Sequence, residues 1–101
     1  MDEATDAIVR KLSEAGSYLR EDSGSRYNTH VSGAEAIETY LTGRNSLGVD
    51  ERDWLIVRAT SQGIIYVLFI APRRDFSQYE PTFQSMLRTF RVTDRDNYNR
   101  Q

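Results

Sequence analysis

The side chains that most often perform catalysis or bind metals are few in this chain. Its 101 residues include one histidine, His30, and no cysteine. A zinc site needs several His, Cys or carboxylate ligands, and no HExxH pair is present. The serines lack a G-x-S-x-G turn and a second histidine to activate them, and no glycine-rich phosphate loop occurs. We therefore predict no catalytic residue, no metal site and no cofactor site.

Carboxylates cluster in the segment VDERD, which contains Asp50, Glu51 and Asp53. Oxygen ligands of this kind could bind a cation weakly, but the segment lacks the ligand spacing of a calcium loop. The sequence favours a solvated loop here. Glu35 and Glu38 lie three residues apart in a predicted strand, so they should face opposite sides of the sheet and cannot form a catalytic pair.

Arginine and tryptophan are better candidates for binding a partner, because both are enriched at the hot spots of protein interfaces. Arg73 and Arg74 follow a predicted strand, where they could hold a carboxylate or phosphate or lie in a solvated turn. Trp54 could be an exposed anchor or a core residue. We predict that partners dock on the loop GRNSLGVDERDW, residues 43–54. The candidate partner-binding residues are Arg44, Arg52, Trp54, Arg73 and Arg74.

The bulk composition is that of one globular domain, 39% hydrophobic and 28% charged. We expect a single domain over residues 1–101 with its core at about 16–93 and a polar tail at 94–101. The net charge of −2 gives no reason to expect nucleic acid as a partner. The longest apolar run, 64–71, has the length of a strand and not of a membrane span. The acidic start does not resemble a signal peptide, so we expect a cytoplasmic protein or a fragment of a longer one.

Hydrophobic periodicity predicts an α+β fold, with an antiparallel sheet of four or five strands covered by a long C-terminal helix. A thin, alanine-rich N-terminal helix should lie at the margin of the sheet. The run IIYVLFIA is apolar throughout, so it should be buried on both faces as the central strand. The predicted helices cover about 2–15 and 76–90, and the predicted strands cover 17–21, 26–31, 34–44, 54–60 and 64–71.

The C-terminal helix carries an aromatic stripe that could belong to a core or to a cofactor site. Its spacings of 3, 4, 3, 1 and 3 residues place the stripe on one helical face. No acidic, basic or histidine side chain lies on this face, so we interpret the stripe as core packing against the sheet. Its members are Phe76, Tyr79, Phe83, Met86, Leu87 and Phe90.

Three segments together resemble a known domain family. THVSGAEAIETYL (29–41) precedes GIIYVLFIAP (63–72), and FSQYEPTFQSMLRTF (76–90) follows, with Thr89 where the family usually has serine. The chain resembles, over roughly residues 16–93, the C-terminal accessory domain of secreted bacterial Ste-type zinc metallopeptidases. Such domains are similar in outline to the PsbP/Mog-like fold, an antiparallel sheet with helices packed against it.

The resemblance implies a non-catalytic accessory or interaction domain, because the HExxH helix of the protease is not in this chain. Its partners would be the protease domain of the same polypeptide or the protein clients of that protease. Its location would be extracytoplasmic, either periplasmic or secreted. The alternative is a free-standing PsbP/Mog-like binding or lipoprotein module, and an independent small enzyme is the third and least favoured hypothesis.

Overall fold

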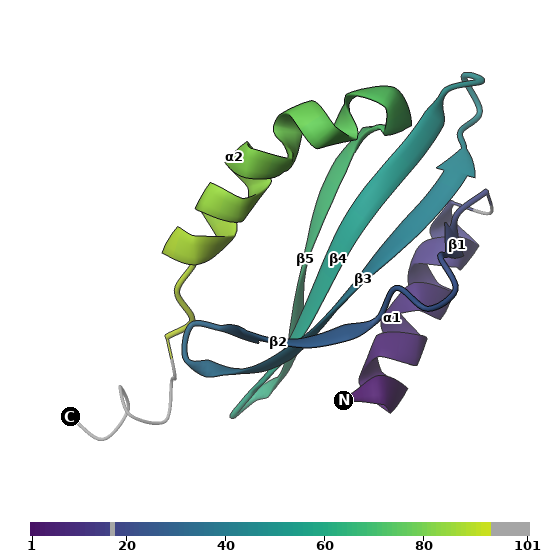
Figure 1. Ribbon diagram of the computed structural model, residues 1–101. Helices are drawn as coiled ribbons and strands as arrows, with labels where there is room; N and C mark the ends of the chain where they lie inside the picture. Colours follow the sequence, from purple (N-terminus) through teal and green to yellow (C-terminus); the bar gives the residue numbers. More distant parts are fainter. Residues whose placement is uncertain (17, 94–101) are drawn as a thin grey trace.

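The computed structural model describes residues 1–16 and 18–93 (Figure 1), so the predicted polar tail at 94–101 lies outside the described residues. A helix, a run of strands and a second helix follow one another as the periodicity predicts, and the fold class, α+β, is confirmed. In chain order they are α1 (Asp2–Ala15), β1 (Arg20–Glu21), β2 (Tyr27–Val31), β3 (Ala34–Arg44), β4 (Asp50–Thr60), β5 (Gly63–Pro72), the short 3-10 helix η1 (Arg73–Asp75) and α2 (Phe76–Thr89).

The five strands form one antiparallel sheet in the order β1-β3-β4-β5. The strand β2 also pairs with β3, so β1 and β2 follow one another along the same side of β3. The predicted hairpin of β2 and β3 is confirmed, and its turn consists of Ser32 and Gly33. Both residues have positive φ, 50° and 82°, as a type I′ turn requires.

The prediction that the run IIYVLFIA forms the central strand is wrong. This run is β5, which pairs only with β4 among the described strands and therefore lies at the edge of the sheet. The interior strands are β3 and β4, and every residue of β4 from Asp53 to Val57 is buried. An apolar run indicates a strand but not its place in the sheet, because an edge strand with one open face can have the same composition.

The helix α2 covers one face of the sheet, as Figure 1 shows for β4 and β5. Its Phe83 ring stacks on Phe69 of β5 at 4.8 Å between centroids, so this part of the aromatic stripe is core, as predicted. Tyr79 and Met86 remain 46% and 55% exposed, so the whole stripe does not pack on the sheet. The core of this face consists of Val31, Ala36, Trp54, Ile56, Phe69, Ala71 and Phe76.

The helix α1 lies near β1 and β3 (Figure 1), and it packs on the face opposite α2. It has 14 residues, the same length as α2, so the C-terminal helix is only moderately long. Although we expected α1 at the margin, it contributes to a second core, and its Thr5 is fully buried. This core contains Leu19, Leu41, Leu55 and Val57, with Ile8, Val9 and Leu12 of α1 packed against it.

Candidate functional site

The β3–β4 hairpin and the end of β5 meet at one end of the sheet. The pairing of Glu51 with Pro72 brings the hairpin next to the turn that follows β5. An open hollow of about 850 Å³ lies between them. It brings part of the predicted docking loop together with the predicted arginine pair. The residues that line it are Gly48, Val49, Asp50, Pro72, Arg73, Arg74 and Asp75.

Asn45 organises the tip of this hairpin. Its side-chain Oδ1 accepts hydrogen bonds from the backbone N–H groups of Leu47 and Val49, at 3.0 and 3.1 Å. Asparagine often closes turns in this way, because its side chain imitates a backbone carbonyl. The turn holds two apolar side chains in solvent, since Leu47 is 86% and Val49 42% exposed. The hairpin tip therefore presents apolar surface beside the hollow.

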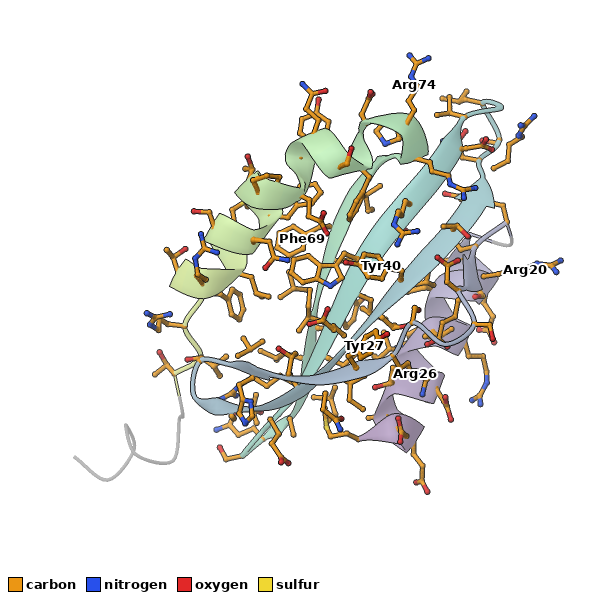
Figure 2. All side chains as sticks on the ribbon, in the orientation of Figure 1. Arg20, Arg26, Tyr27, Tyr40, Phe69 and Arg74 are labelled. Carbon is orange, nitrogen blue, oxygen red and sulfur yellow. The ribbon has the colours of Figure 1, made fainter. Side chains whose placement is uncertain are left out.

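The arginines around the hollow differ in how strongly they are already paired. Arg44 Nε donates to Asp50 Oδ1 at 3.0 Å across the hairpin. The Arg74 side chain is 91% exposed and only approaches Asp75, at 4.0 Å. Figure 2 shows Arg74 projecting away from the ribbon at this end of the molecule. Arg73 is also exposed and has no ion pair among the described residues. Arg73 and Arg74 are thus available to an anionic group.

The other two predicted partner-binding residues lie on the α2 face and do not line the hollow. Arg52 places its guanidinium 4.2 Å from the centre of the Tyr40 ring and pairs with Asp22 at 3.2 Å. The proposal that Trp54 is an exposed anchor is wrong, because only 1% of it is exposed. Its ring stacks on Phe69 at 5.4 Å. Trp54 is a core residue because alternate positions of β4 point under α2.

A buried acidic pair lies on the opposite face of β4, where the sequence favoured a solvated loop. That prediction is wrong, since Glu51 is 8% and Asp53 0% exposed. Tyr18 covers the pair, and its hydroxyl donates to Glu51 Oε1 at 3.1 Å. Gly43 permits this approach, because a Cβ there would lie 2.0 Å from the Tyr18 carbonyl oxygen. The acidic pair is therefore part of the interior between β3, β4 and the segment after α1.

Asp53 lacks the hydrogen bonds that usually accompany a buried carboxylate. Neither of its oxygens has a partner among the described residues. Burial, and then the neighbouring Glu51, raises the pKa of Asp53 to about 8. Burial and Glu51 also raise the pKa of the Tyr18 phenol. At neutral pH Asp53 is therefore mainly a neutral acid.

A signal for the buried pair was present in the sequence. Residues 51, 53, 55 and 57 alternate with 52, 54 and 56, so an extension of the predicted strand 54–60 by four residues puts Glu51 and Asp53 on the same face as Leu55. The predicted strand begins at Trp54, and the segment before it is predicted as a loop. The structure instead has a strand of 11 residues that begins at Asp50.

The described residues contain no group of three or more side chains suited to hold a metal ion. His30 is exposed on β2 and is not part of such a group. Neither helix in the described part of the chain combines the length and apolarity that a membrane crossing needs.

Comparison with known proteins adds no family to this description. No protein-family model, curated protein or solved structure matches the chain.

Proposed function

We propose that the chain is a non-catalytic interaction domain that binds a segment of another protein, or of its own polypeptide, in the hollow at the end of the sheet. In the context of the resemblance described above, this is the accessory domain of an extracytoplasmic bacterial zinc metallopeptidase. Its partner is then the protease domain of the same polypeptide or a client protein.

The observation that carries the proposal is the combination of exposed arginines without a close ion pair and exposed apolar side chains around one hollow. Arg73 and Arg74 are exposed on one side of it, and Val49 is 42% exposed on the other. Arginine is enriched at interface hot spots because it combines a flat apolar surface with charged donors. Surface arginines that are already paired contribute less, and Arg44 is occupied by Asp50.

The geometry favours a ligand segment that carries a carboxylate next to an apolar side chain. The carboxylate would accept hydrogen bonds from Arg73 and Arg74, and the apolar side chain would lie against Val49 and Pro72. Asp75 and Asp50 line the same hollow and would repel a second, badly placed carboxylate. The site is therefore expected to distinguish the positions of acidic residues in a peptide and not only its net charge.

An NMR titration of the ¹⁵N-labelled chain tests the proposal. The probe is a capped peptide of alternating leucine and glutamate, and the control peptide replaces glutamate by glutamine. We expect shifts at residues 45–50 and 72–75 with the acidic peptide, and much weaker shifts with the neutral one.

The matched variants are Arg73→Ala/Arg74→Ala and Arg20→Ala, since Arg20 is an exposed arginine on β1 that lies away from the hollow (Figure 2). The double variant should weaken binding by at least about tenfold, or roughly 1.4 kcal/mol, whereas Arg20→Ala should bind as the unaltered chain does. Equal weakening by both variants, or shifts confined to the outer face of α2, would contradict the proposed site.

A second candidate function, a free-standing PsbP/Mog-like binding or lipoprotein module, is favoured by a smaller hollow of about 310 Å³. Trp54 lines this hollow, and its Nε1 is buried without a hydrogen-bond partner among the described residues. A small polar molecule that accepts a hydrogen bond would satisfy this donor. Shifts centred on the Trp54 indole N–H during screening with small molecules would favour this function over peptide docking. The hollow also involves His30, Glu38, Gln84 and Arg88.

A further inference from the structure

The two edges of the sheet differ in how well they are protected against pairing with another strand. On one side lie β1, with two residues, and β2, with five. Short, interrupted edges of this kind do not template long strand pairing. On the other side lies β5, with ten residues and no described strand beyond it. Its sequence, GIIYVLFIAP, contains no charged side chain and has proline only at its last position.

The edge strand also leaves an apolar stripe open on the face that α1 covers only in part. Alternate residues of β5 point to this face, where Ile64 is 43%, Tyr66 44% and Ile70 57% exposed. Leu68 lies between them and is half-buried. Exposed apolar surface that is continuous along an unprotected edge marks an interface, because monomeric proteins usually place lysine, proline or a bulge at such an edge.

We infer that β5 pairs with β5 of a second copy of this chain in antiparallel orientation, so that two sheets join into one. A twofold axis near Val67 would place Ile64 opposite Ile70 of the partner subunit and Tyr66 opposite Leu68 of the partner subunit. Residues that face each other across antiparallel strands lie on the same side of the sheet. The two open stripes therefore become one continuous apolar surface.

The absence of charge on β5 makes a second copy the occupant that fits best. A twofold interface brings each residue type close to a copy of itself or of its neighbours, so a charged edge would oppose like charges. An uncharged edge of ten residues avoids this cost at every position. The segment 94–101 of the same chain, DRDNYNRQ, fits poorly, because four of its eight residues are charged.

The first test is the mass in solution, measured by size-exclusion chromatography with light scattering over a dilution series. The unaltered chain should approach twice its 11.7 kDa at high concentration and dissociate on dilution. Tyr66→Lys places like charges across the twofold axis and should weaken dimerisation by at least about tenfold. Met86→Lys is the matched control, since Met86 is an exposed apolar residue on α2 and its variant should dimerise normally.

Circular dichroism should show that Tyr66→Lys is folded, and Ile64→Lys serves as a second variant if it is not. A chain that stays monomeric at every concentration overturns the inference. So does a dimer that Tyr66→Lys and Ile64→Lys leave intact, or an open series of larger oligomers, which a closed twofold contact does not produce.

The second test uses the fact that the chain has no cysteine, so one introduced thiol reports on a single position. Tyr66→Cys should form a covalent dimer rapidly with a short bismaleimide. Ser85→Cys, on the exposed outer face of α2, is the control and should react slowly. Equal rates for the two variants would show that collisions and not a β5 interface explain the cross-link, and would overturn the inference.

Discussion

On the α2 face of β4, Trp54 and Ile56 lie against aromatic rings, whereas on the α1 face Asp53 and Leu55 lie beside Glu51 and Tyr18. These residues alternate along one strand, so they share the same backbone and nearly the same depth. The α2 face is covered by the helix α2, and aromatic rings pack against one another between the helix and the sheet. The α1 face contains two carboxyl groups next to an aliphatic core and stays open over β5.

The difference shows what buries a residue in this fold. Trp54 is buried because Phe69 and Tyr40 stack on either side of it, at 5.4 and 6.4 Å. Asp53 is buried because β3, β5 and Tyr18 surround its position, although its oxygens gain no hydrogen bond. Burial of the first residue stabilises the fold, whereas burial of the second costs free energy, and the cost is larger when the carboxyl group is ionised.

The largest expected effect on the free energy of unfolding concerns the aromatic core on the α2 face. Trp54→Ala removes the ring at the centre of the α2 face and should lower the free energy of unfolding by about 3 to 5 kcal/mol. Urea denaturation followed by circular dichroism measures it. Leu47→Ala, at a residue that is 86% exposed, should change the value by less than about 0.5 kcal/mol. A small loss for Trp54→Ala would mean that the α2 face is not a tightly packed core.

The stability of the folded chain should depend on pH, because Asp53 is buried on the α1 face. The pKa of Asp53 is about 8 in the folded chain, against an ordinary value of 3.8, so the folded state binds this proton more tightly than the unfolded state. The contribution of Asp53 to stability is therefore complete below about pH 4 and is lost as the pH rises to about 8.

Asp53→Asn should remove this dependence, because an amide cannot ionise. At pH 9 the variant should be more stable than the unaltered chain by about 2 to 5 kcal/mol, at about 1.36 kcal/mol for each unit of pKa difference. Urea titrations at several pH values measure it, and Asp50→Asn, at an exposed residue, is the control. If both variants keep the pH dependence, Asp53 does not cause it.

Glu21 on β1 provides a carboxylate with the opposite behaviour. Arg26 donates to both of its oxygens, and Thr39 donates at 2.6 Å, so these hydrogen bonds lower the pKa of Glu21 despite partial burial. Its contribution is present above the ordinary pKa and is lost as the pH falls through the lowered one.

Glu21→Gln should therefore destabilise the chain by about 1 to 2 kcal/mol at pH 7, because it removes charge-assisted hydrogen bonds. The difference should shrink at pH 3, where the unaltered side chain is being protonated. Thermal denaturation at the two pH values measures it. A penalty of the same size at both values would indicate lost packing instead of lost charge.

The smallest effect is expected at the end of the sheet. Arg73→Ala and Arg74→Ala should each change stability by less than about 0.5 kcal/mol, because both side chains are exposed and make no strong ion pair among the described residues. Thermal denaturation of each variant beside the unaltered chain measures this. A larger loss would assign these arginines a structural role and weaken their proposed role in docking.

Much of the fold could be predicted from local patterns. The turn at Ser32 and Gly33 and the helical spacing of Phe76 and Phe83 are local signals, and the structure agrees with them. The place of β5 in the sheet could not be predicted, because strand order depends on contacts between distant segments. A run of apolar residues looks the same in a covered strand and in an edge strand with an open face.

The candidate site was predictable only in part. Arg73 and Arg74 were expected at a strand end, and they lie there beside the hairpin that was expected to dock partners. Trp54 and Asp53 are buried in β4 instead of lying in the predicted docking loop 43–54, because the strand begins at Asp50. Charge predicts exposure well on average, but strand alternation decides the direction of each side chain.

The state of Asp53 is the most direct test of the difference between the two faces of β4. An NMR titration of the chain ¹³C-labelled in its side-chain carboxyl groups measures the pKa of this group without any substitution. We predict a midpoint of about 8 for Asp53, well above that of a freely solvated aspartate. A midpoint below about 5 would show that water or a hydrogen-bond donor reaches the carboxylate, and would contradict the account of a buried, unpaired acid on the α1 face.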